Sequence, residues 1–175
     1  GVFFAIPKGW TKVSQKSLDA RETSSNASGA AERAASVLWQ EAYSLNPKIT
    51  ATEVLSLKTP QEPIVYVRVR NLLGAEINSV SYNSLRDLVV PLTSWVDGTK
   101  KSPVFDISND EERVEKGARG VHSVFNFVQL DGSDQTIDQT SLLSNDHSTI
   151  YALLIRCSTT CYDKNRTILE KIAAS

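Results

Sequence analysis

Four segments of the chain have strand-like patterns, and the first of them alternates with a period of two, as half-buried β-strands do. These segments are "PIVYVRVRNLL" at 63–73, "GVHSVFNFVQL" at 120–130, "QTIDQTSLL" at 135–143 and "TIYALLIRC" at 149–157. In the first, the valines at 65, 67 and 69 share one face, and Tyr66, Arg68 and Arg70 share the other. Turn residues, Asp131-Gly132 and then Ser144-Asn145-Asp146, separate the last three segments, so these strands are predicted to be antiparallel neighbours.

Weaker alternation predicts further β-structure in the first third of the chain. The opening "GVFFAIPKGWTKVS" is interpreted as a hairpin with a turn at 7–9. Its first strand would carry Val2, Phe4 and Ile6 on one face, and its return strand Trp10 and Val13. The segment "TATEVLSLK" at 50–58 is interpreted as another strand. The polar segments 21–29 and 98–119 lack a clear period and are predicted to be loops, the second with at most a short helix.

Three segments have apolar residues at helical spacing. The first is alanine-rich, spans 31–45 and ends before a proline. The second spans 81–96 and begins at the cap residue Ser81; Pro91 is expected to kink it or divide it in two. The third follows the last strand, with Thr160 as its cap and Asp163 completing a capping box. Its inward-facing residues are predicted to be Cys161, Ile168, Leu169 and Ile172.

Strands joined by tight turns, with helices before, between and after them, indicate an α+β architecture. We expect an antiparallel β-sheet of about six strands flanked by helices. The 175 residues, of which 41% are hydrophobic, are enough to bury one sizeable core, so a single domain spanning 1–175 is predicted.

Charge and hydropathy exclude several classes of partner. Nineteen basic and twenty acidic residues give a net charge of −1, and the basic doublet at 100–101 is not part of a stripe, so no nucleic-acid partner is expected. No apolar run approaches the roughly 18 residues of a membrane span, and no targeting segment opens the chain. Because the sequence starts at Gly1 and contains no methionine, we expect a removed upstream segment, which could carry an anchor. A monomer or a weak dimer is expected.

Both cysteines, Cys157 and Cys161, lie where the last strand meets the last helix. A tight connection there would bring their β-carbons close together, so a disulfide is the favoured interpretation, and it would imply an oxidising compartment. Three alternatives stay open. The first is a zinc site formed by the two cysteines with His122 and His147, although the spacing of the four residues is not that of a zinc finger. The second is a nucleophilic Cys161 with His147 as its base. The third is a pair of unbonded buried thiols.

The sequence contains no motif of a known catalytic or phosphate-binding site, so no catalytic residue, metal or cofactor is expected. The acidic residues at 110–112 are interpreted as a solvated surface. His122 is interpreted as a hydrogen-bonded histidine on a sheet face. Trp95 belongs to the apolar stripe of its helix, whereas Trp10 and Trp39 could line a groove, because aromatic residues contribute strongly to recognition surfaces.

The carboxyl-terminal segment "RCSTTCYDKNRTILEKIAAS" resembles the end of exported actinobacterial proteins of the PsbP-like superfamily, which includes the LpqN-type lipoproteins. The opening "VFFAIPKGW" resembles the first hairpin of that superfamily, and "GARGVHSVFNFVQLDG" its central strands. The resemblance covers about half of the chain. It implies an α/β/α sandwich built on an antiparallel sheet, a bridge between Cys157 and Cys161, and an accessory or binding role without catalytic residues.

We therefore expect an extracytoplasmic, non-enzymatic accessory or binding domain of a bacterial surface protein or lipoprotein. Its ligand would be an unidentified protein or small molecule. One alternative is an intracellular adaptor of the same fold that binds a partner protein. The other is an enzyme, such as a hydrolase, that uses Cys161 or His122.

Overall fold

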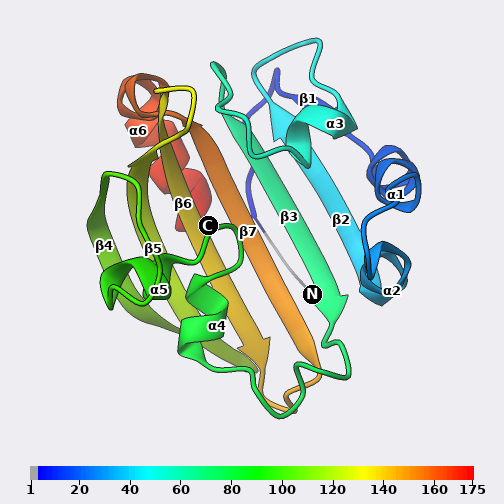
Figure 1. Ribbon diagram of the computed structural model, residues 1–175. Coiled ribbons are helices and arrows are strands. Elements are labelled where there is room, and N and C mark those ends of the chain that lie inside the picture. Colours follow the sequence, from blue (N-terminus) through cyan, green and yellow to red (C-terminus); the bar gives the residue numbers. More distant parts are fainter. Residues whose placement is uncertain (1–3) are drawn as a thin grey trace.

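The computed structural model describes residues 4–175, and they form one sheet of seven antiparallel strands with helices on both faces (Figure 1). The strands follow the order β1-β2-β3-β7-β6-β5-β4 across the sheet. The elements in chain order are β1 Thr11–Val13, α1 Gln15–Thr23, α2 Ala30–Ser36, β2 Val37–Ser44, α3 Ala51–Val54, β3 Ile64–Asn71, α4 Tyr82–Arg86, α5 Leu92–Val96, β4 Phe105–Glu115, β5 Ala118–Val128, β6 Asp134–Ser144, β7 Thr149–Ser158 and α6 Thr159–Ala173. The α+β class is confirmed, with seven strands rather than about six.

The two faces of the sheet are covered differently. Helices α1 to α5 lie on the face toward the viewer in Figure 1, and α6 lies alone behind the sheet. Cys157 and Ile155 of β7 pack against α6, so we call their side of the sheet the α6 face. Residues directly opposite in paired strands point to the same side, which assigns Tyr151, Val67 and Trp39 to the α6 face as well.

The strongest sequence patterns are confirmed. Strands β3, β5, β6 and β7 form over the four strand-like segments, and the valines of β3 share the α6 face. Ser81 caps α4 by accepting a hydrogen bond from the amide of Ser84, as predicted. The helix expected over 81–96 is divided into α4 and α5, and Pro91 lies immediately before α5. Proline cannot donate within a helix, which is the reason for the division.

The helix predicted over 31–45 is wrong in its second half. Helix α2 ends at Ser36, and the chain continues directly as β2, in which Trp39 and Tyr43 lie on the α6 face and Ala42 is buried on the other. The residues of β2 also fit a period of two, and pairing with β1 and β3 decides between the two patterns.

The strand predicted over 50–58 is also wrong, because this segment begins with the short helix α3. Thr50 accepts a hydrogen bond from the amide of Glu53, and the Glu53 carboxylate accepts one from the amide of Thr50. This capping box is readable in the sequence as Thr-x-x-Glu and outweighs the weak alternation around it.

The two segments predicted to be loops are partly regular. Residues 21–23 complete helix α1, whose Leu18 is fully buried although the helix is otherwise polar. Residues 105–115, within the segment predicted to be a solvated excursion, form the edge strand β4. Charged residues are common on edge strands, where they discourage pairing with other chains, and this explains its polar composition.

Two terminal details of the prediction are corrected as well. Of the opening hairpin, Val2 lies outside the described residues, and residues 4–6 form no strand, whereas β1 pairs with β2. The alternation of Phe4 and Ile6 reflects packing on the α6 face instead. Helix α6 is capped by Ser158, whose hydroxyl accepts from the amide of Cys161, two residues before the predicted cap Thr160.

Helix α6 is too short to cover the whole α6 face. Its 15 residues span about 22 Å at 1.5 Å per residue, whereas the ten residues of β7 span about 34 Å. Leu169 and Ile172 anchor the helix over one end of the strands. The part of this face that α6 does not cover contains the N-terminal arm, residues 4–10, and an open groove.

Candidate functional site

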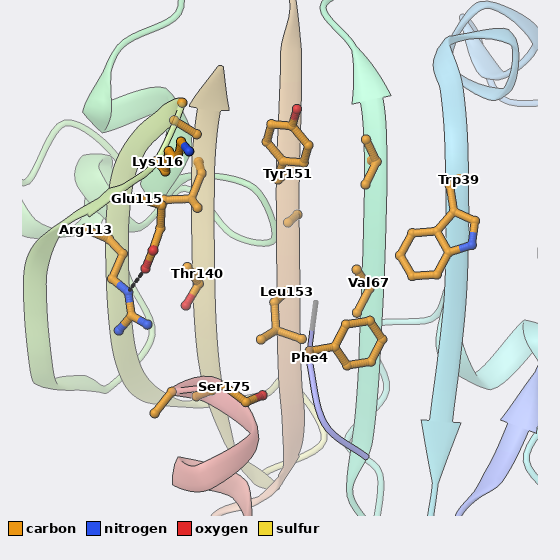
Figure 2. Close-up of a pocket in the computed structure, with 17 residues that line it drawn as sticks. Phe4, Trp39, Val67, Arg113, Glu115, Lys116, Thr140, Tyr151, Leu153 and Ser175 are labelled. Carbon is orange, nitrogen blue, oxygen red and sulfur yellow. Dashed lines mark hydrogen bonds and ion pairs between the residues drawn. The ribbon is translucent and has the colours of Figure 1, made fainter. Parts of the chain in front are cut away.

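A cavity of about 740 Å³ lies on the α6 face beyond the end of α6, and we call it the main groove (Figure 2). Its floor crosses the sheet from β2 to β4, which is five strand spacings or about 24 Å. Trp39, Val67 and Leu153 supply the floor on the side of β2, β3 and β7. Leu142 of β6 and Ala118 of β5 continue it toward β4.

Strand β5 contributes a small residue, Ala118, to the floor of the groove. Gly120 follows on the same face of β5 but does not line the groove. A Cβ atom at Gly120 would lie 1.9 Å from the main-chain oxygen of Ser141, so only glycine is tolerated there. Strands β5 and β6 therefore approach each other closely at this position.

The polar groups of the main groove gather at its β4 end. Arg113 Nε and Glu115 Oε1 form an ion pair at 3.1 Å, and Lys116 follows in the turn to β5. The Thr140 hydroxyl oxygen is buried and has no hydrogen-bond partner among residues 4–175. The groove thus combines a mainly apolar floor with a polar end, which is the arrangement of a site for an amphiphilic molecule.

A second cavity of about 510 Å³, the side pocket, adjoins the main groove at Phe4 and Trp39. It lies between the N-terminal arm and β2, and its lining includes Trp10 and Tyr43. Desolvation and a 2.6 Å hydrogen bond to Glu41 raise the pKa of Tyr43 to about 12, so its hydroxyl stays protonated and donates. The interpretation of Trp10 and Trp39 as groove residues is confirmed, and Trp95 packs against Phe105 and Phe127 as expected for the core.

His122 is a structural residue of the α6 face, as predicted, and it does not line either cavity. Its Nε2 lies 2.8 Å from Asp138 Oδ1, and its Nδ1 lies 3.2 Å from Glu111 Oε1. The hydrogen bond to Asp138 is the largest cause of a raised pKa for His122. Asp138 also accepts a hydrogen bond from the hydroxyl of Tyr162 in α6, so the network ties the helix to the sheet.

The acidic residues at 110–112 lie on the edge strand β4 rather than in the predicted loop, and they have structural partners. Asp110 pairs with Arg86 and accepts from Ser123. Glu112 accepts a hydrogen bond from the hydroxyl of Tyr82. These contacts hold α4 to the sheet edge, and none of the three carboxylates reaches the main groove.

Cys157 and Cys161 form a disulfide, with their Cα atoms 5.9 Å apart. A bonded sulfur is neither a thiolate nucleophile nor a zinc ligand, so the alternatives that need a free Cys161 are wrong for this structure. His147 lies in an exposed turn with a φ of 57°. Within residues 4–175, no group of three or more His, Cys, Asp or Glu side chains is arranged to hold a metal ion.

The bridge gives a simple chemical prediction. We expect no reactive thiol in the native protein or in denaturant alone, and two thiols once reductant is added to the denatured chain, as measured by thiol titration. Replacing both cysteines with serine is expected to lower the free energy of unfolding by about 2 kcal/mol, because the closed loop is short. Two thiols that titrate in denaturant without reductant would contradict the assignment.

Comparisons with known proteins place the chain in no family. No protein-family model and no curated protein matches it. One similar solved structure is that of PA94, a protein of unknown function from Pseudomonas aeruginosa. The TM-score is 0.47 at 8% identity, over 75% of this chain and 77% of that chain, which carries no functional argument. Among the helices of residues 4–175, none is long and apolar enough to cross a lipid bilayer.

Proposed function

We propose that the protein is a non-catalytic binding domain that holds an elongated, mainly apolar ligand in the main groove. The observation that carries the proposal is the apolar floor, which extends across several strands at one end of the α6 face. Its volume of about 740 Å³ falls in the range of small-molecule sites, roughly 300–1,000 Å³.

The chemistry of the floor favours a hydrocarbon chain over a peptide. The strands under the groove pair with one another along the sheet, so their main-chain donors and acceptors are already used. A peptide laid on this floor would leave buried polar groups without partners, at a cost in free energy. A hydrocarbon chain has no such groups, and its polar end would lie near Arg113 and Thr140.

An extracytoplasmic location belongs to the same proposal. A buried disulfide persists in an oxidising compartment and is rare in the cytosol, which argues against an intracellular adaptor. The resemblance to exported PsbP-like proteins agrees with this location. The proposal of an accessory domain of the PsbP-like type, on a bacterial surface, rests on that resemblance and on the disulfide together.

The groove is tested by placing a charge on its floor. Leu142→Asp is expected to weaken binding of the fluorescent amphiphile 11-(dansylamino)undecanoic acid by at least about tenfold, because the new carboxylate would be desolvated beneath the ligand. Leu142 is only half-buried, so the variant is expected to fold. The measurement is a fluorescence titration, together with the urea midpoint of each protein.

The matched control is Leu130→Asp, at a fully exposed leucine outside both cavities. It is expected to bind the probe as the wild type does. Absence of saturable binding to the wild type, or equal affinities for the two aspartate variants, would refute the groove as the binding site.

A further inference from the structure

Phe4 stands at the boundary between the two cavities of the α6 face. Phe4 and Trp39 line the main groove (Figure 2), and both also line the side pocket. Its ring centroid lies 6.2 Å from that of Trp39 and 6.0 Å from that of Tyr43. Without the Phe4 side chain, the 740 Å³ and 510 Å³ spaces would join along the surface of β2.

The described aromatic contacts of Phe4 lie over β2, whereas the part of the arm that follows is anchored in the core. Ile6 and Trp10 pack against the core cluster under α6. At Phe4 itself, the two aromatic contacts are supplemented by one neighbouring hydrogen bond, from the Ala5 amide to Ser175 Oγ at 2.9 Å. Residues 4–7 pair with no strand among the described residues. Phe4 therefore lies beyond the last anchored apolar residue of the arm.

We propose that Phe4 is a displaceable partition that determines how long a ligand the site accepts. This inference rests on the proposed function of the main groove. A short hydrocarbon chain occupies the main groove and leaves Phe4 against Trp39. A longer chain reaches the boundary, moves Phe4 away from Trp39 and Tyr43, and extends along the aromatic rings of the side pocket, whose lining also includes the charged residues Lys8 and Glu41.

The contacts that a longer ligand would gain can replace those that Phe4 would lose, which supports displacement of the Phe4 side chain. Each methylene group transferred from water to an apolar site strengthens binding by about fourfold. Among the described residues, Phe4 makes two tilted or edge-on aromatic pairs, and a few additional methylene groups can replace contacts of this size. Displacing Phe4 nevertheless costs part of the gain, so the affinity of the wild type should rise less steeply once the chain reaches this residue.

The test is a comparison of chain lengths. Saturated fatty acids of 8 to 14 carbons are titrated into the wild type and into Phe4→Ala, Phe4→Leu and the control Leu130→Ala, with calorimetry as the readout. Short acids are expected to bind Phe4→Ala no more tightly than the wild type, because Phe4 lines the main groove and its truncation removes an apolar contact. For the longest acids, Phe4→Ala is expected to bind about tenfold more tightly, since no side chain has to move. Phe4→Leu should be intermediate, and Leu130→Ala should match the wild type.

The outcomes separate this inference from the proposed function. Equal dependence on chain length in all four proteins would overturn the partition while leaving the groove as the site. A uniform loss of affinity at every length in Phe4→Ala would also overturn it, because Phe4 would then be an ordinary contact. If no acid binds any of the proteins, the proposed function itself fails. Urea midpoints identify a folding defect, and Phe4→Leu then provides the comparison.

Discussion

Replacing Arg156 with methionine is expected to lower the free energy of unfolding by about 3–5 kcal/mol, the largest effect of any single change considered for this protein. Arg156 lies on β7 on the face opposite α6 and is 4% exposed. Its guanidinium donates to the main-chain oxygens of Glu53, Val54, Ser56 and Lys58 and to Oε1 of Gln135. The five acceptors lie on the end of α3, the segment that follows it, and strand β6.

This arginine fixes an irregular segment to the sheet. Burial lowers the pKa of Arg156 to about 10, so the group is charged at neutral pH although it makes no ion pair with any of residues 4–175. Methionine retains much of the side-chain volume but leaves buried carbonyl groups without donors, and each costs about 1–3 kcal/mol. The connection between α3 and β3 is expected to lose its order first.

Urea denaturation checks this prediction. The matched control is Arg166→Met on α6, where the guanidinium is half-exposed and pairs with Asp163 and Glu170. A surface pair of this kind contributes less than about 1 kcal/mol. Equal losses of stability in the two variants would show that the five acceptors find other donors when Arg156 is removed.

Strong local patterns predict the central strands of the sheet. Where the local pattern is weak or ambiguous, pairing with strands distant in the sequence determines the secondary structure. The pattern is clear in β3, whose valines share one face, and β5, β6 and β7 are marked by apolar runs between turn residues. In β2 the residues fit both helical and strand spacing, and the neighbours that select the strand lie at 11–13 and 64–70. Strand β4 contains mostly polar and charged residues, so a pattern based on hydrophobicity could not find it. The capping box of α3 is readable as Thr-x-x-Glu, and it outweighs the weak strand-like pattern of the same segment.

The candidate groove could be predicted from the sequence only in part. Trp39 does not fit the apolar stripe of the predicted helix, and this mismatch arises from its true place on β2 facing the groove. The groove itself depends on the lengths of α6 and β7 relative to each other. This relation is not a property of a short segment. Phe4 carried no signal beyond alternation, because its role depends on the two cavities that meet there.

Replacing Asp138 with asparagine is expected to lower the free energy of unfolding by about 2–3 kcal/mol at pH 6, and by less at pH 9. Asp138 is 2% exposed and accepts hydrogen bonds from Tyr162 at 2.6 Å and from His122 at 2.8 Å. Asparagine keeps the shape of the side chain but removes the charge that both donors face. The connection between α6, β5 and β6 is therefore weakened.

The pH dependence follows from His122. Its pKa is raised in the folded state, first by Asp138 and further by Glu111, which lies on β4. The protonated form is thus stabilised by folding. This contribution is present in full below the unfolded pKa of about 6.5 and is lost as the pH rises through the higher folded value. Wild-type stability should accordingly decrease between pH 6 and pH 9, and the Asp138→Asn variant should show a smaller decrease.

Urea unfolding at several pH values between 5 and 9, with NMR titration of the His122 ring, measures both effects. His147→Asn is the matched control, because this histidine lies in an exposed turn and asparagine tolerates its positive φ. The control should reproduce the wild-type profile. If Asp138→Asn and the wild type lose the same stability between pH 6 and pH 9, the hydrogen bond between His122 and Asp138 does not carry the linkage. The ionised pair would then have no part in holding α6 over the sheet, and Tyr162 alone would account for the contribution of Asp138.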